Sequence, residues 1–237
     1  MIKHIPVVAT LALSLPVAAS AEDRTVGVGS FSRIRIEGGF DVRVLDGSPR
    51  ARISGERSAI EAVDLQVSGT TLVIRRSINS SWSERPVTAG RGAVTIALTT
   101  SGLEAATVTG GARVEIARMR GRRVDLSVAG AGGITVANVR ADQVVAQVVG
   151  AGSIALAGTT GSARLTTNGP GTIDADKLDA GDLVVRLDGL GATTARARYT
   201  ATIDNSGLGL VSVAGSPKCT VRAGAGGPVA CGRSGVR

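Results

Sequence analysis

Residues 124–152, with the sequence VDLSVAGAGGITVANVRADQVVAQVVGAG, hold one full period of a repeat. An alternating apolar run precedes Gly130-Ala131-Gly132, a second short run follows at Ile134-Thr135-Val136, and a polar turn leads to the next glycine pair. Alternation with period two places one face of a strand inside and the other outside. The unit therefore predicts a strand, a glycine corner, a second strand and a turn.

The glycine pair recurs at nearly even spacing, and its first glycines are Gly110, Gly130, Gly150, Gly169, Gly189, Gly207 and Gly224. A period of about 20 residues is typical of a solenoid, in which each coil buries its apolar face only against its neighbours. Glycine suits a corner that needs positive φ or a close backbone approach. The predicted corner glycines are Gly130, Gly132, Gly150, Gly152, Gly169, Gly171, Gly189, Gly191, Gly207 and Gly209.

Composition agrees with a thin, aliphatic, all-β solenoid. Hydrophobic residues make up 43% of the 237 residues, but aromatic residues only 2%. A sandwich or barrel of this size usually fills its interior with more large rings, whereas stacked Val, Ile, Leu and Ala side chains fill a narrow cross-section. The N-terminal part follows the same alternation less regularly.

The N-terminal segment, residues 1–21, is predicted to be a signal peptide. Lys3 provides a positive start, residues 5–17 are apolar, and Ala19-Ser20-Ala21 is typical of a cleavage site between Ala21 and Glu22. The apolar stretch is short for a membrane span, which needs about 20 residues, and no later stretch is apolar enough to cross a bilayer. We therefore expect an exported protein that resides in the periplasm, at the cell surface or at the outer membrane.

Residues 22–237 are expected to form a single solenoid domain, with residues 77–91 as a polar surface loop and residues 216–237 as a C-terminal cap. The two cysteines, Cys219 and Cys231, both lie in the predicted cap. A disulfide is the default state for cysteines in an exported chain. Free thiols or an incomplete metal site are the alternatives.

The chain resembles the head GIN domain family, whose members are named putative auto-transporter adhesins, over roughly residues 28–227. The resemblance depends on the opening alternation, a second aliphatic run and the later glycine corners. These are Phe31-x-x-Ile34-x-Ile36-x-Gly38-x-Phe40-Asp41-Val42-x-Val44, then Leu72-x-Ile74, then the corners given above. It implies an envelope or surface protein with a right-handed β-helix-like fold and no known activity. Ala129, Val149 and Asp188 stand where family members commonly carry Ser or Asn.

The sequence gives little support to catalysis, cofactors or metals. The one histidine, His4, lies in the predicted signal peptide, so Ser-His and Cys-His nucleophile pairs are excluded from the mature chain. The glycine corners lack the following helix that a dinucleotide site requires. Asp174, Asp176, Asp179 and Asp182 could hold calcium weakly, but no complete ligand set is visible, and a solvated acidic face is favoured.

Candidate contacts for a partner are one aromatic and several basic side chains. The net charge of +8 suits an anionic envelope polymer or a protein, although it also serves solubility. Export and the lack of interleaved aromatics argue against nucleic acid. The expected ligand contacts are Trp82 and Arg85 in the polar loop and Arg118, Arg120, Arg122 and Arg123 in the densest basic cluster.

The leading hypothesis is a non-enzymatic envelope protein whose rigid solenoid presents an adhesin-like or scaffold surface to an envelope polymer or protein. A polysaccharide-active β-helix enzyme is the alternative, and it would need paired carboxylates in a groove beside Trp82 or Tyr199. A third hypothesis is a structural module that self-associates through its solenoid ends.

Overall fold

A computed structural model describes residues 22–77 and 94–232. It confirms the all-β solenoid of about six turns, and 72% of these described residues are strand and 3% helix. The described residues do not include the predicted signal peptide or nearly all of the predicted loop, which contains Trp82 and Arg85. The elements are β1 (Glu22–Val26), β2 (Arg33–Glu37), β3 (Asp41–Asp46), β4 (Arg50–Gly55), α1 (Arg57–Glu61), β5 (Val63–Ser68), β6 (Thr71–Arg76), β7 (Thr95–Thr100), β8 (Ala105–Gly110), β9 (Arg113–Ile116), β10 (Met119–Gly130), β11 (Gly133–Val149), β12 (Ser153–Asn168), β13 (Thr172–Asp188), β14 (Ala192–Asn205), β15 (Leu210–Gly215), β16 (Lys218–Ala223) and β17 (Val229–Cys231).

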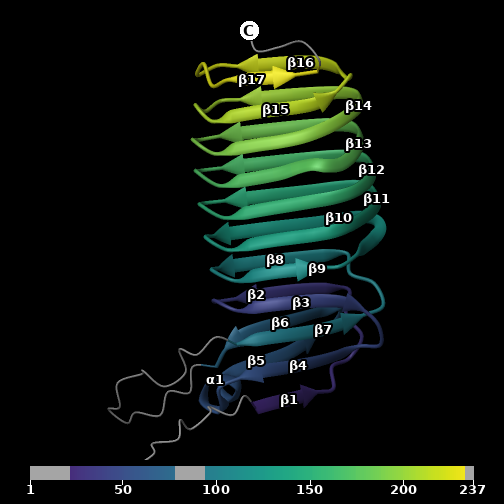
Figure 1. Ribbon diagram of the computed structural model, residues 1–237, viewed down its shortest axis with the longest axis vertical. Coiled ribbons are helices and arrows are strands. Elements are labelled where there is room, and N and C mark those ends of the chain that lie inside the picture. The colour runs from purple at the N-terminus through teal and green to yellow at the C-terminus, as the bar shows by residue number, and fades with distance from the viewer. Residues whose placement is uncertain (1–21, 78–93, 233–237) are drawn as a thin grey trace, which may run out of the picture.

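Each coil has two flat sides, which meet at the glycine corner at one end and at a bend at the other. The coils stack along the long axis of the molecule (Figure 1). The side that leads into each glycine corner is called the pre-corner face, and the side that leaves it is called the post-corner face. The long strands β10–β14 pass around the bend without interruption, so the bend is also hydrogen-bonded from coil to coil. The pre-corner face includes residues 105–110, 125–130, 143–149, 162–168, 182–188, 200–205 and 218–223; the post-corner face includes residues 113–116, 133–136, 153–156, 172–175, 192–197, 210–215 and 229–231.

Parallel pairing in register aligns equivalent inward side chains into continuous rows. One row on the pre-corner face passes from Leu126 through Ala146, Leu165 and Val185 to Ile203. Each of these side chains is at most 2% exposed. Burial of a Leu, Ile or Val side chain contributes about 1.5–3 kcal/mol. Stacking therefore provides the apolar contacts that a single coil cannot make alone.

The two glycines of each corner meet different constraints. The first has positive φ at the predicted corners other than Gly207, as at Gly150 (+103°) and Gly189 (+125°), where an L side chain is strained. The second lies against the coil below. A Cβ on Gly191 would stand 2.1 Å from the carbonyl oxygen of Gly171 and 2.9 Å from that of Gly169. The corner therefore needs glycine both for backbone conformation and for space.

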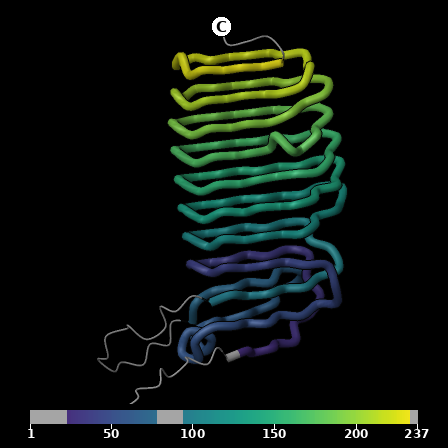
Figure 2. Tube along the Cα trace, viewed as in Figure 1, coloured from purple at the N-terminus to yellow at the C-terminus, as the bar shows by residue number. Residues whose placement is uncertain are grey.

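The N-terminal coil is inserted into the middle of the stack, so coil order departs from chain order. β2 pairs in parallel with both β6 and β8, and β3 pairs with both β7 and β9. Figure 2 shows this purple coil between the blue and teal parts of the chain. Below it, the antiparallel pairs β1–β4, β4–β7 and β5–β6, together with α1, form the base.

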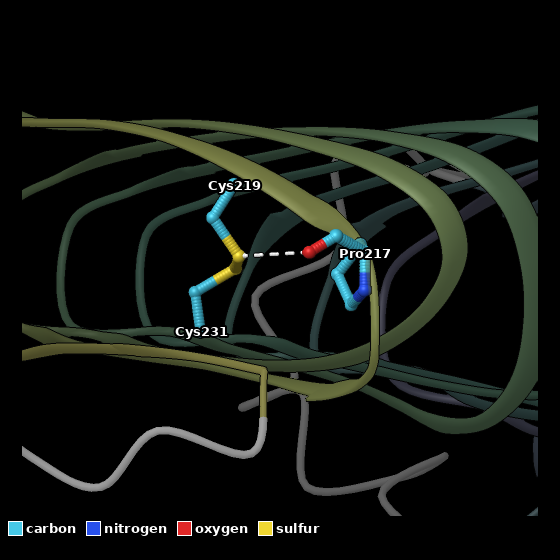
Figure 3. The surroundings of a disulfide bond; sticks show 3 residues. All are labelled: Pro217, Cys219 and Cys231. Carbon is cyan, nitrogen blue, oxygen red and sulfur yellow. Dashed lines mark hydrogen bonds between the residues drawn. A yellow bond between two sulfur atoms is a disulfide. The ribbon is translucent and has the colours of Figure 1, made fainter.

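The C-terminal end carries the predicted disulfide, which the structure confirms between Cys219 and Cys231. Cys219 stacks above Ala201 on the pre-corner face, and Cys231 stacks above Val213 on the post-corner face. The bond thus joins the two faces across the last coil (Figure 3). The Cys219 Sγ also lies 3.5 Å from the Pro217 carbonyl oxygen, as a contact only, since an oxidised sulfur has no proton to donate.

Substitution of Gly191 by Ala should destabilise the protein by at least about 2 kcal/mol, because the new methyl group meets backbone rather than a side chain that can move. Gly111 is the matched control, because a Cβ there meets nothing within 4 Å. Gly111→Ala should change stability by less than about 0.5 kcal/mol. Urea unfolding followed by circular dichroism measures both, and equal midpoints for the two variants would contradict the close-approach account.

Loss of the disulfide should loosen the last coil while leaving the middle of the stack intact. The cysteines are 12 residues apart, and a loop of this length contributes about 3 kcal/mol by chain entropy. In the Cys219→Ser, Cys231→Ser double variant, hydrogen exchange should rise in β15–β17 and stay slow in β11–β13. Unchanged exchange in β15–β17 would show that the crosslink does not serve as a cap, the role predicted for residues 216–237.

Candidate anion-binding surface

The predicted basic cluster divides into neutralised and unpaired arginines. Arg118 forms an ion pair with Asp46. The Arg123 Nε donates to both carboxylate oxygens of Asp125 at 2.9 and 3.0 Å. These two side chains therefore have local counter-charges and offer little to a ligand.

The other two predicted arginines lie beside a third that the sequence analysis did not select. Arg120 on β10 stands in register with Arg140 on β11. Within residues 22–77 and 94–232, Arg120, Arg122 and Arg140 are exposed and form no ion pair or side-chain hydrogen bond. Like charges directly opposite each other on neighbouring strands are destabilising. We call these three residues the arginine row.

A shallow groove of about 430 Å³ lies at the bend beside the arginine row. Gly121 and Gly161 leave room for it because they carry no side chains. At Gly161 a Cβ would stand 2.9 Å from the carbonyl oxygen of Asp142, so backbone forms the floor. The lining residues are Gly121, Arg140, Ala141, Asp142, Thr159, Thr160, Gly161 and Arg198. The exposed Thr159 side chain, two arginines and one carboxylate thus line the groove, whereas the buried Thr160 hydroxyl donates to the Ser162 carbonyl oxygen.

A β-bulge places an exposed aromatic ring beside this groove. The register between β13 and β14 steps from Ala180–Ala197 to Asp182–Thr200, so Gly181 faces both Arg198 and Tyr199. Tyr199 is 63% exposed. The Arg198 guanidinium lies 5.3 Å from the centre of the Tyr199 ring, so the groove and the ring are joined by one side chain. Alternation alone did not reveal this arrangement, because the bulge interrupts it.

The four aspartates considered as a calcium site are each engaged by the next coil. Thr194 Oγ1 donates to Asp174 at 2.9 Å, and Thr200 Oγ1 donates to Asp182 at 2.6 Å. Arg196 and Arg198 form ion pairs with Asp176 and Asp179 at 3.4 and 3.5 Å. Among the described residues there is no group of three or more His, Cys, Asp or Glu side chains that could hold a metal ion. The carboxylates of this acidic strand are therefore engaged by hydroxyl and guanidinium groups of the next coil.

Comparisons with known proteins agree with this architecture. The family model described as putative auto-transporter adhesin, head GIN domain, matches residues 30–217. A putative adhesin from Bacteroides fragilis is similar in structure, with a TM-score of 0.71 and 19% identity over 91% of this chain and 94% of that one. A putative adhesin from Parabacteroides distasonis has a TM-score of 0.65 and 16% identity, covering 90% and 94% of the two chains. No curated protein matches.

No helix among the residues that the structure describes is both long and apolar enough to cross a membrane.

Replacement of Arg140 by Thr should leave stability unchanged or raise it by up to about 0.5 kcal/mol, because it removes a like charge opposite Arg120. Arg43 is the matched control, since its Nε lies 3.1 Å from Glu115 in the same kind of register pair. Arg43→Thr should cost up to about 1 kcal/mol. Denaturation at low salt measures both effects, which should shrink in about 1 M salt. A loss of stability from Arg140→Thr equal to that from Arg43→Thr would contradict the unpaired state of the row.

Proposed function

We propose, because this chain belongs to the head GIN domain family of putative auto-transporter adhesins, that it is an exported, non-enzymatic adhesin-like module that binds an anionic polymer of the cell envelope. The arginine row and the adjoining groove at the bend are the proposed contact surface. The disulfide supports export, because such bonds persist in oxidising compartments. We place the protein in the periplasm, at the cell surface or at the outer membrane.

The observation that carries the proposal is the Arg120–Arg140 pair. Two guanidinium groups face each other in register without a carboxylate partner in the described residues. Their repulsion disfavours the folded state, and an anionic ligand would relieve it. Guanidinium groups also present planar donor pairs that match carboxylate, sulfate and phosphate groups.

The stack suits an extended polymer. Neighbouring strands lie about 4.8 Å apart, so a chain along the solenoid axis meets a new coil at each such step. The outward side chains are held by hydrogen-bonded strands on both sides, which reduces the entropy lost when a ligand binds. A polymer can therefore contact the arginine row, the groove and Arg198 in succession.

The groove supports binding over cleavage. Glycoside hydrolysis by the usual mechanisms uses two carboxyl groups on either side of the scissile bond. Asp142 is the one carboxylate that lines the groove. On the adjoining coil, Asp179 and Asp182 contact Arg198 and Thr200. These partners occupy the carboxylates that a polysaccharide-active enzyme would need beside Tyr199.

Binding of the purified protein to immobilised dextran sulfate tests the proposal. The Arg120→Ser, Arg140→Ser double variant should bind about tenfold more weakly, because each of the two charge-assisted contacts contributes about 0.7 kcal/mol at an exposed site. The salt dependence of its affinity should also decrease. The wild type should not release reducing ends from polysaccharide.

The control is the Arg43→Ser, Arg113→Ser double variant. It removes the same charge from the post-corner face, where both arginines have carboxylate partners. An equal loss of affinity in both double variants would show that net charge alone attracts the polymer. Measured turnover of a polysaccharide would overturn the non-enzymatic assignment.

A further inference from the structure

A second hollow lies on the pre-corner face, across β12, β13, β14 and β16. These strands lie towards the C-terminal end of the stack (Figure 1). Two rows of outward residues meet there. In one row Arg164, Val184, Thr202 and Thr220 are in register; in the next row Thr166, Arg186, Asp204 and Arg222 are in register. The hollow encloses about 230 Å³. It forms because the short side chains of Val184, Thr202 and Thr220 lie between long arginines.

The hollow carries a net charge of two positive units. Arg164 and Arg222 form no ion pair with any other described residue. Arg186 lies 3.8 Å from Asp204, which is longer than a direct hydrogen bond. Three arginines thus surround the single carboxylate of Asp204, which neutralises only part of their charge.

The three arginines can reach one small ligand. Arg186 and Arg222 are two strands apart, which places their Cα atoms about 10 Å from each other. Arg164 is a diagonal neighbour of Arg186, at about 7–8 Å. Arg164 and Arg222 are three strands apart, with about 16 Å between their Cα atoms, so these two exposed side chains reach opposite ends of a ligand that lies above Val184 and Thr202.

The polar groups around the hollow specify more than an anion. Arginine only donates hydrogen bonds, a carboxylate only accepts them, and threonine does both. A ligand that satisfies Arg164, Arg222 and Asp204 together needs an anionic group and hydroxyl donors. Val184 and the threonine methyl groups offer an apolar floor to its C–H face. Sulfate has no hydroxyl donor for Asp204 and would be repelled by it.

We propose that this hollow binds one carboxylate-bearing sugar residue, with Arg186 and Arg222 contacting the carboxylate, Arg164 donating to a ring hydroxyl oxygen at the opposite end of the sugar, and Asp204 accepting hydrogen bonds from ring hydroxyls. Its volume supports a small ligand, since pockets that enclose drug-sized molecules occupy about 300–1,000 Å³. The site is separate from the arginine row and does not depend on it. It would give the protein selectivity for uronic-acid sugars beyond general attraction to polyanions.

Titration with digalacturonate, followed by the amide signals of the labelled protein, tests this site. Signals of β12–β14 and β16 around Val184 and Thr202 should shift. The affinity should fall about five- to tenfold in Arg164→Ser and in Arg222→Ser, because each loses a charge-assisted contact. Arg33→Ser is the control, since Arg33 is exposed on β2 of the same face but lies coils away, and it should leave the affinity unchanged.

The Asp204→Asn variant distinguishes a sugar acid from a simple anion. It should weaken digalacturonate binding about threefold or more and strengthen binding of inorganic sulfate, because it exchanges one of the two acceptor oxygens for an amide donor and removes the negative charge. Three outcomes would each overturn the proposal. Asp204→Asn could weaken the binding of both probes, the wild type could bind galactobiose and digalacturonate equally, or the amide shifts could be confined to the arginine row. Because Arg120 and Arg140 are untouched in Arg164→Ser and Arg222→Ser, dextran sulfate binding by these two variants reports separately on the bend.

Discussion

The close approach of backbone to backbone at the glycine corners is the constraint on which the whole structure depends. At Gly209 a Cβ would stand 2.0 Å from the carbonyl oxygen of Gly191, and at Gly207 one would stand 2.1 Å from that of Gly189. From Gly130 onward the coils stack at strand spacing because both corner positions are free of side chains, whereas Ala112 takes the second position of the preceding corner. With the coils at this spacing, parallel pairing continues around the bend, and the aliphatic rows close into one core. A side chain at one corner would separate two coils and interrupt every row.

In-register stacking also determines the chemistry of the surface. Residues about one period apart become neighbours, as in the contacts of Asp174 with Thr194 and of Asp176 with Arg196. The same rule brings Arg120 beside Arg140. Whether an outward residue is neutralised or available therefore depends on what stands one period away. Asp174 and Asp176 have partners there, whereas Arg120 has another arginine.

The repeat period and the expected compartment were sufficient to predict the corners, the core faces and the disulfide from sequence. The insertion of β2–β3 was not predictable in this way, because alternating strands fit any neighbour equally well. Arg140 could have been predicted as a neighbour of Arg120, since a shift by one repeat period aligns the two residues. The contact of Arg198 with Tyr199 and the position of Arg186 and Arg222 on either side of Asp204 could not, because register shifts near Ala180 change the spacing. Buried Thr167 and Thr193, which hydrogen-bond across the core at 3.1 Å, interrupt the aliphatic pattern.

Exposed arginines contribute little individually, because water and salt screen each contact. A rigid stack compensates by repetition along its axis. When a polymer is held at one coil, its next segment is already near the following coil, so later contacts form as intramolecular events at high effective concentration. Among the described residues β16 pairs only with β14, and it carries Lys218 and Arg222; charge at an edge strand opposes pairing with another copy. The outward faces, rather than the ends, are therefore the surfaces best suited to a partner.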